Sequence, residues 1–352
     1  MKKNNKLWLT ELNKSIKSYE ELVCNIELSE KEKAAFENKL ALPFAITPHI
    51  LNLIKSGDPN GAIRKQFIPI CSSNNLRFSD DFLDETGNEV APCLVQRYPY
   101  KAIMIVTQTC PAYCRFCTRS RIVGNHSANN FEKALSYIKN HPEIYDIVIT
   151  GGDPLILCND KLKEIFEKIK KIKSVSILRL NTRIPVNLPS RIDAELLKLL
   201  RESKVFVNIH FEHPDELSEQ TKKVCLEMAD NGIVLGSQSV LLKGINDDED
   251  TLKRLFLGLL KIKVKPYYIY QCDKVYGCED FYLPPETGIN LINRIAPQLP
   301  GIAVPKFVVD VPGKVGKSCV APNGIVGKDK NKLIFKNFYT QEETIYETDT
   351  TT

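Results

Sequence analysis

From residue 102 onward the chain alternates between short apolar runs and longer amphipathic stretches. Six apolar runs are expected to be buried strands, and they read AIMIVTQ, YDIVITGG, SVSILRLNT, VFVNIHF, GIVLGSQSVLL and KPYYIYQCD. Between them lie amphipathic stretches of helical length, such as NDKLKEIFEKIKKI and DAELLKLLRES. Strands that are apolar throughout and are joined by crossover helices are typical of parallel βα units.

The pattern therefore predicts an α/β protein whose six βα units curl into a partial (βα)6 barrel, similar to part of a TIM barrel. An open doubly wound sheet is the alternative, but no G-x-G-x-x-G motif follows the first strand. We expect a helical N-terminal extension over residues 1–95, the barrel over 96–285 and a C-terminal segment over 286–352. Within the extension, Thr47-Pro48 is a start signal for a helix.

Polar and cysteine-rich residues come just after the predicted strands. They are Cys110 to Cys117, Gly151-Gly152-Asp153, Asn181-Thr182-Arg183, His210, Gln238-Ser239 and Asp273. In βα barrels the active site lies at the carboxyl ends of the strands. We therefore expect six separate loops to direct their chemistry toward one face.

The segment TQTCPAYCRFCTRSR places Cys110, Cys114 and Cys117 in the spacing C-x3-C-x2-C. Three thiolates on one loop suit three corners of an iron–sulfur cube, and they leave the fourth iron open to an outside ligand. A structural zinc site would normally need four ligands, and a redox dithiol would need only two cysteines. Chance grouping of buried thiols is disfavoured because arginines interleave with the cysteines.

This spacing after the first strand of a partial βα barrel is similar to the signature of the radical S-adenosylmethionine superfamily. The resemblance implies a 4Fe-4S cluster whose open iron is chelated by S-adenosylmethionine, which yields a 5′-deoxyadenosyl radical on one-electron reduction. The segment TGGDP resembles the glycine-rich stretch that takes the amino group of this cofactor, which implies that role for Gly151, Gly152 and Asp153. Taken alone, TGGDP is also typical of a turn that ends a strand.

Further segments resemble the lysine 2,3-aminomutase family, from about Leu42 to Asn323. They are QRYP, NTRIPVNLPSRI, HFEHP, LGSQSVLLKGIND, KPYYIYQCD and VPKFVVDVPGKVGK. Lys317 is expected on a flexible glycine-bearing loop, where an amine can form a Schiff base with pyridoxal phosphate. The resemblance implies that Lys317 is the catalytic lysine and holds this cofactor. It also implies cofactor-binding roles for Arg97, Tyr98, His210 and Gln238.

The same resemblance implies how a substrate is held. Arg119 matches the residue that pairs with the substrate carboxylate, a task suited to a guanidinium fork. Asp273 and Asp310 match the pair that binds the distant ammonium group of lysine. Because two carboxylates repel an acidic side chain, a cationic substrate is favoured, with lysine ahead of arginine.

The implied reaction is a 1,2-amino migration that converts L-lysine to β-lysine, which makes the chain an isomerase. Two alternatives within this chemistry are arginine 2,3-aminomutase and an enzyme that supplies β-lysine to elongation factor P. A different class is a noncatalytic iron–sulfur electron carrier, which would need neither Lys317 nor the paired acids.

Two segments depart from the family pattern. Longer clostridial-type relatives build a zinc site from a cysteine after VND and a C-terminal cysteine cluster, whereas this chain reads GINDDEDT, with Asp248 at the first position, and shows no such cluster. We therefore predict no zinc. The loop PGKVGK carries Lys314 and Val315 where glycines are usual, which predicts a stiffer and more basic loop.

Composition and charge add limits on partners. The formal net charge of +5, from 48 basic and 43 acidic residues dispersed along 352 positions, does not predict nucleic-acid binding. With no apolar run of membrane-spanning length and no apolar leader, a cytoplasmic protein is expected. The odd count of 11 cysteines argues against a disulfide framework. We expect a small amino acid substrate, a flavodoxin- or ferredoxin-type reductant and a homodimer.

Overall fold

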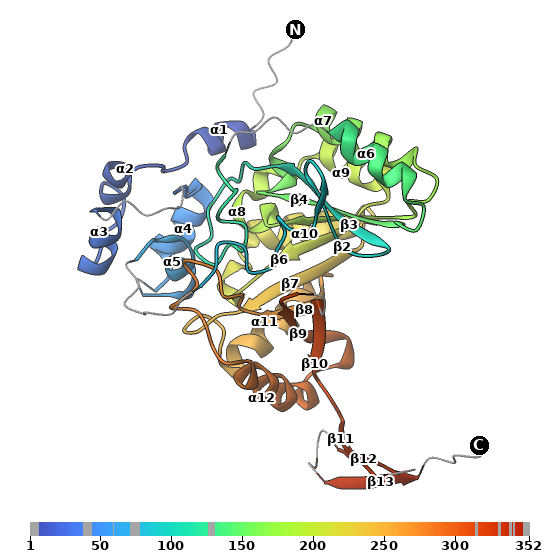
Figure 1. Ribbon diagram of the computed structural model, residues 1–352. Coiled ribbons are helices and arrows are strands. Elements are labelled where there is room, and N and C mark those ends of the chain that lie inside the picture. Colours follow the sequence, from blue (N-terminus) through green and yellow to red (C-terminus); the bar gives the residue numbers. More distant parts are fainter. Residues whose placement is uncertain are drawn as a thin grey trace.

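A ten-stranded mixed sheet forms the centre of the protein (Figure 1). The structure is a computed structural model that describes residues 7–37, 44–58, 60–70, 78–125, 131–313, 316–329, 332–337, 340 and 342–347. The expectation about the loop positions Lys314 and Val315 lies outside the described residues. The strands run in chain order across the sheet. They are β1 (Glu89–Ala91), β2 (Leu94–Tyr98), β3 (Lys101–Thr107), β4 (Asp146–Gly151), β5 (Ile177–Thr182), β6 (Phe206–His210), β7 (Leu235–Leu241), β8 (Lys265–Gln271), β9 (Lys306–Val311) and β10 (Gly316–Ala321).

The six strands predicted from the apolar runs are β3 to β8, and all of them pair in parallel. The structure adds β9, which is parallel to β8, and three antiparallel strands, β1, β2 and β10, toward the two ends of the sheet. β1 and the start of β2 fall within residues 1–95, where helices were expected. They are short and lack a continuous apolar run, so their pairing rather than their composition makes them strands.

Except for the short buried helix α8 (Ile184–Asn187), the helices between the strands match the amphipathic stretches. They are α6 (Phe131–Asn140), α7 (Asn159–Lys170), α9 (Ala194–Ser203), α10 (Glu219–Asp230), α11 (Glu249–Lys261) and α12 (Pro285–Ile295), with 3-10 turns at Pro154–Ile156, Pro189–Arg191, Pro214–Glu216, Ala296–Gln298 and Gly301–Ala303. Asp193, Ser218 and Asp248 cap α9, α10 and α11 by accepting a backbone N–H. Asp248 therefore has a structural task as the cap of α11.

The N-terminal region before β1 contains short helices. They are α1 (Leu7–Asn13), α2 (Tyr19–Val23), α3 (Glu30–Glu37), α4 (Pro48–Ser56) and α5 (Ala62–Phe67). The Thr47-Pro48 signal is confirmed, because the Thr47 hydroxyl accepts the Ile50 N–H at 3.3 Å. The same hydroxyl donates to the backbone carbonyl of Asn187 at 2.5 Å, and this bond attaches the start of α4 to α8.

The sheet curls without closing into a complete ring of hydrogen-bonded strands. β1 and β10 are the two ends of the strand order. Arg97 on β2 donates to the carbonyls of Val311 and Gly313, and the Tyr98 hydroxyl accepts the Lys317 N–H at 2.8 Å. Side chains thus join the two ends of the sheet, which gives the partial barrel predicted from the sequence.

A second, three-stranded antiparallel sheet lies apart from the main sheet at the C-terminal end (Figure 1). Its strands are β11 (Ile325–Asp329), β12 (Lys332–Lys336) and β13 (Glu343–Glu347). Among the described residues, no helix combines the length and the apolar character needed to cross a bilayer.

Candidate active site

The three cysteines lie on the loop that follows β3, and this loop is bonded to the end of β4. Gly152 N–H donates to the carbonyl of Thr107 at 2.8 Å, and Asp153 N–H donates to that of Thr109 at 3.0 Å. A Cβ on Gly151, whose φ is +145°, would lie 2.0 Å from Thr107 O, and one on Gly152 would lie 2.3 Å from Thr109 O. Both glycines are therefore required by the close approach of two backbones.

The thiols lie in an interior environment. Burial raises the pKa of Cys117 to about 11 and also raises the pKa values of Cys110 and Cys114. At Cys114 the charge of Arg183 opposes the effect of burial. The Cys110 thiol donates to Ala112 O at 3.0 Å, and the Cys114 sulfur accepts from Arg183 NH1 at 2.7 Å. Within the described ranges no three His, Cys, Asp or Glu side chains are already grouped as metal ligands. The fit to an iron–sulfur cluster therefore rests on the donor chemistry of three thiols on one loop.

Asp153 connects the end of β4 to the end of β5. Its carboxylate accepts the Thr182 hydroxyl at 2.7 and 2.9 Å and the Arg183 N–H at 2.7 Å, and it also accepts the Leu155 N–H at 3.1 Å. Burial raises the pKa of Asp153 to about 6, against these hydrogen bonds and a small effect of His210. His210 itself, at the end of β6, lies with Nδ1 3.7 Å from the buried carboxylate of Glu212.

Lys317 lies in β10, so the expectation of a flexible loop at this residue is wrong. Its partner in the antiparallel register is Asp310 of β9, and Lys317 Nζ forms an ion pair with that carboxylate. Asp310 is buried and also receives Arg97 NH1 at 3.3 Å. Lys317 Nζ lies 4.4 Å from the centre of the Tyr270 ring. The ladder between β9 and β10 orders the lysine because the two strands are directly paired.

Two further predicted residues contact this group. A Cβ on Gly316 would lie 2.5 Å from the Tyr98 hydroxyl oxygen, so Tyr98 packs directly on the start of β10. Gln238 lies inside β7 rather than after it, and its Nε2 donates to the Tyr270 hydroxyl at 3.2 Å. Tyr270, on β8, thus contacts both Gln238 on β7 and Lys317 on β10.

Asp273 follows β8 and lies close to Asp310. Burial raises the pKa of Asp273 to about 7, and the charge of Asp310 adds to this rise while Lys317 and Arg97 oppose it. Asp310 thus pairs directly with the amine of Lys317, and the charges of both residues act on the buried Asp273. Two neighbouring carboxylates repel each other when both are ionised, which the raised pKa of Asp273 reflects. A cation in addition to Lys317 would therefore stabilise the ionised pair.

Arg119 is already bound on one edge by a residue of the chain. Its Nε and NH2 donate to Glu85 Oε1 at 3.0 and 2.7 Å, while NH1 donates to the Thr150 hydroxyl at 3.2 Å. Burial would raise the pKa of Glu85, but the Arg119 and Arg121 guanidinium groups together outweigh burial and the pKa is lowered. Arg121 supports the same carboxylate from 3.4 Å.

Sequence reasoning missed Glu85 and Tyr270, and it gave Arg183 no role beyond its place after a strand. Glu85 lies in a stretch without strand or helix periodicity, and no local signal marks it. Arg183 and Tyr270 occur in the segments NTRIPVNLPSRI and KPYYIYQCD, where their position at a strand end or within a strand was the available signal. Neither segment indicates which partner these side chains contact.

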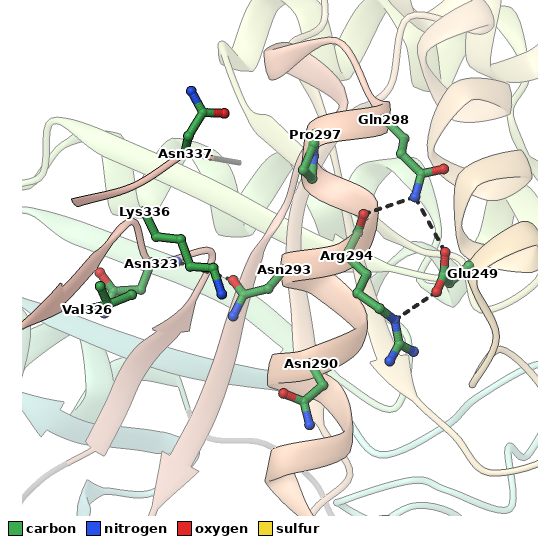
Figure 2. Close-up of a pocket in the computed structure, with 10 residues that line it drawn as sticks. All are labelled: Glu249, Asn290, Asn293, Arg294, Pro297, Gln298, Asn323, Val326, Lys336 and Asn337. Atoms are coloured by element: carbon green, nitrogen blue, oxygen red, sulfur yellow. Dashed lines mark hydrogen bonds and ion pairs between the residues drawn. The ribbon is translucent and has the colours of Figure 1, made fainter. Parts of the chain in front are cut away.

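A pocket of about 750 Å³ lies elsewhere, between α12 and the β11–β12 hairpin (Figure 2). It is lined by Glu249, Asn290, Asn293, Arg294, Pro297, Gln298, Asn323, Val326, Lys336 and Asn337. None of these residues belongs to the predicted site. Arg294, the most prominent charge, is 61% exposed and already pairs with Glu249 at 2.7 Å. The convergent strand ends, rather than this pocket, are therefore the candidate active site.

Two family profiles match the chain. The profile of the Radical SAM superfamily covers residues 104–255, which include the cysteine loop, and that of Lysine-2,3-aminomutase covers residues 292–350, which include Asp310 and Lys317. The first match implies a 4Fe-4S cluster and S-adenosylmethionine. A solved structure of Streptococcus suis SuiB bound to S-adenosylmethionine aligns with 60% of this chain and 51% of its own, at 13% identity and a TM-score of 0.46.

Curated relatives extend the likeness over most of the chain. L-lysine 2,3-aminomutase of Acetoanaerobium sticklandii is 39% identical, and that of Clostridium subterminale is 40% identical, each over 94% of this chain and 82% of the relative. Glutamate 2,3-aminomutase of Clostridioides difficile is 34% identical over 95% of this chain and 81% of its own length. The chain therefore belongs to the lysine 2,3-aminomutase family, a family of radical S-adenosylmethionine isomerases.

Proposed function

We propose that the protein converts L-lysine to β-lysine by migration of the α-amino group to the neighbouring carbon, with pyridoxal phosphate as a further cofactor. The observation that carries the proposal is the buried Asp310 paired with the amine of Lys317, with the charges of both acting on a second buried acid, Asp273. An electron carrier would have no use for this arrangement. Relatives named L-lysine 2,3-aminomutase support the same reaction class.

Each cofactor has residues suited to it. We assign Cys110, Cys114 and Cys117 as ligands to three irons of the cluster. We assign Gly151, Gly152 and Asp153, at the end of β4, to the binding of S-adenosylmethionine. Bound pyridoxal phosphate would supply a conjugated ring that spreads unpaired spin.

We assign Lys317 to the covalent attachment of pyridoxal phosphate. Arg97 and Tyr98 support it, since Tyr98 orients the Lys317 backbone and Arg97 shares Asp310 with it. His210 and Gln238 complete the proposed cofactor pocket. Gln238 contributes by fixing the hydroxyl of Tyr270.

The two ends of the substrate meet opposite charges. The pKa of Asp273, raised to about 7 by burial and by Asp310, means that an entering cation stabilises the ionised pair. An acidic side chain would be repelled there, which favours lysine over the glutamate named for the C. difficile relative. A guanidinium also suits two acids, so arginine is the competitor.

The other end of the substrate is a carboxylate, for which we assign Arg119. Glu85 holds the Nε edge of Arg119, so the remaining N–H groups of the fork are fixed in direction. Such preorganisation places a substrate without further ordering of the side chain. Thr150 adds a contact from the end of β4.

The proposed chemistry also needs an electron donor, for which we propose a flavodoxin- or ferredoxin-type protein. A thiol-ligated cluster that is reduced in each activation suits the reducing cytoplasm. The exposed apolar side chains of Val326, Ile345 and Tyr346 on the C-terminal sheet support the expected homodimer, which light scattering would measure.

Anaerobic incubation tests the function directly. Reconstituted protein is mixed with S-adenosylmethionine, pyridoxal phosphate and dithionite, and lysine, arginine, glutamate and alanine are offered in separate incubations. We expect the protein to isomerise lysine. Turnover of arginine alone would establish the competitor, and turnover of only glutamate or alanine would contradict the role of the two acids. Lys317→Ala should abolish turnover and leave iron content unchanged, and retained activity would contradict its role.

A further inference from the structure

Arg183, the first residue after β5, directs its guanidinium at the cysteine loop. Arg183 NH1 lies 2.7 Å from the sulfur of Cys114, and the side chain is only 7% exposed. The sequence pattern identifies Arg183 as a polar residue just after a strand, and it is not among the residues proposed to bind substrate or cofactor. An N–H that points at a thiol proposed as an iron ligand has a direct electronic consequence.

The guanidinium is held from several sides. Its NH2 donates to Gln66 Oε1 and to Glu216 Oε1, the latter at 3.1 Å, and Gln66 Nε2 donates to the same Glu216 oxygen at 2.9 Å. The rings of Phe67 and Phe116 lie 5.0 and 5.3 Å from Arg183 Cζ. Because Glu216 is fully buried, its carboxylate gains no compensating water, and this strengthens its hold on Arg183.

We propose that Arg183 is a positioning residue that fixes the Cys114 sulfur through an N–H···S bond and raises the reduction potential of the cluster bound there. The inference rests on the proposed assignment of the three cysteines. Reduction adds a negative charge to the cluster, and hydrogen bonds to its sulfurs together with nearby positive charge stabilise that reduced state. Glu216 partly cancels the charge of Arg183, so the two residues act on the potential with opposite signs.

The chain offers a matched control. Arg179 lies within β5, four residues before Arg183, which places it roughly 13 Å away along an extended chain. It too is largely buried and pairs with one acid, Asp146, at 2.7 Å. Replacing Arg179 therefore removes a comparable ion pair from within β5, away from the strand end that Arg183 follows.

The test is a potentiometric titration of the reconstituted cluster, followed by electron paramagnetic resonance in the absence of S-adenosylmethionine, pyridoxal phosphate and lysine. At a fixed potential, Arg183→Gln should lower the ratio of reduced to oxidised cluster about tenfold, which is a midpoint about 59 mV more negative for one electron. Glu216→Gln should move the midpoint in the positive direction, and Arg179→Gln should leave it unchanged. A midpoint for Arg183→Gln equal to that of Arg179→Gln, or more positive than the wild type, would overturn the proposal.

Iron analysis and thermal unfolding accompany each variant. If Arg183→Gln fails to hold four irons, the midpoint potential of Glu216→Gln decides the test. A midpoint equal to or more negative than that of the wild type overturns the inference. Failure of the wild type to isomerise any amino acid, with the cluster titrating as expected, would contradict the proposed function alone. The two failures are thus distinguishable.

Discussion

Lys317 and Asp310 are directly opposite each other in the antiparallel ladder of β9 and β10, and their side chains form an ion pair. The register places the amine of Lys317 next to Asp310, the acid that we propose binds the distant ammonium group of the substrate. The same carboxylate also receives Arg97 from β2, at the far end of the curled sheet. Asp310 therefore lies where the proposed cofactor pocket and substrate pocket meet.

Asp310→Asn should raise KM for lysine and lower kcat/KM by a hundredfold or more. Removing one partner of a buried charge pair costs about 2–5 kcal/mol. Steady-state kinetics under anaerobic conditions measure the effect. Asp146→Asn, which removes the acid paired with Arg179, is the control and should retain kcat/KM within a few-fold. An unchanged KM in Asp310→Asn would contradict the assignment of the substrate ammonium to this acid.

Asp273 should make the folded protein less stable as pH rises from about 4 to 7. Its folded-state pKa of about 7 lies above the ordinary value of 3.8, chiefly through burial, so the folded state binds more protons than the unfolded state in this window. The free energy of unfolding then falls with pH, by at most roughly 1.4 kcal/mol per pH unit. Urea unfolding between pH 4.5 and 7.5 should show a shallower decline for Asp273→Asn, and identical slopes would show that Asp273 does not titrate in this range.

Glu85→Gln should raise KM for lysine about tenfold or more with a smaller change in kcat. The charged hydrogen bonds that it weakens are worth about 1.5–3 kcal/mol, and they orient Arg119 before the substrate arrives. Glu32→Gln is the matched control, because Glu32 is also buried and pairs with a different arginine, Arg64, at 2.7 Å. Equal KM values for the two variants would mean that Glu85 does not position the fork.

Gly152→Ala should reduce both the thermal stability and the iron content of the reconstituted protein. Its Cβ would lie 2.3 Å from the backbone oxygen of Thr109, so the cysteine loop would have to move. Forced repacking of this kind costs about 1–3 kcal/mol. At Gly301 a Cβ meets nothing within 4 Å, so Gly301→Ala should leave iron content and melting temperature near those of the wild type. Full iron loading in Gly152→Ala would show that the loop tolerates the displacement.

The residue pattern by itself determined the strands β3 to β8, the helices that join them and the cysteine loop after β3. These features are local, because apolar runs, helical periodicity and a three-cysteine spacing are each contained in a short stretch of chain. The family resemblance then selected Arg97, Tyr98, Asp273, Asp310 and Lys317, and the structure brings these five together. Their roles in binding and catalysis stay predictions.

Only the tertiary structure decided how the candidate site is assembled. The pairing of β9 with β10 placed Lys317 on a strand opposite Asp310, whereas its neighbouring glycines had indicated a loop. Glu85 reaches Arg119 from 34 positions away, and Arg183 reaches Cys114 from 69. Such contacts depend on which strand ends the curled sheet brings together, and neither charge pattern nor spacing along the chain encodes that proximity.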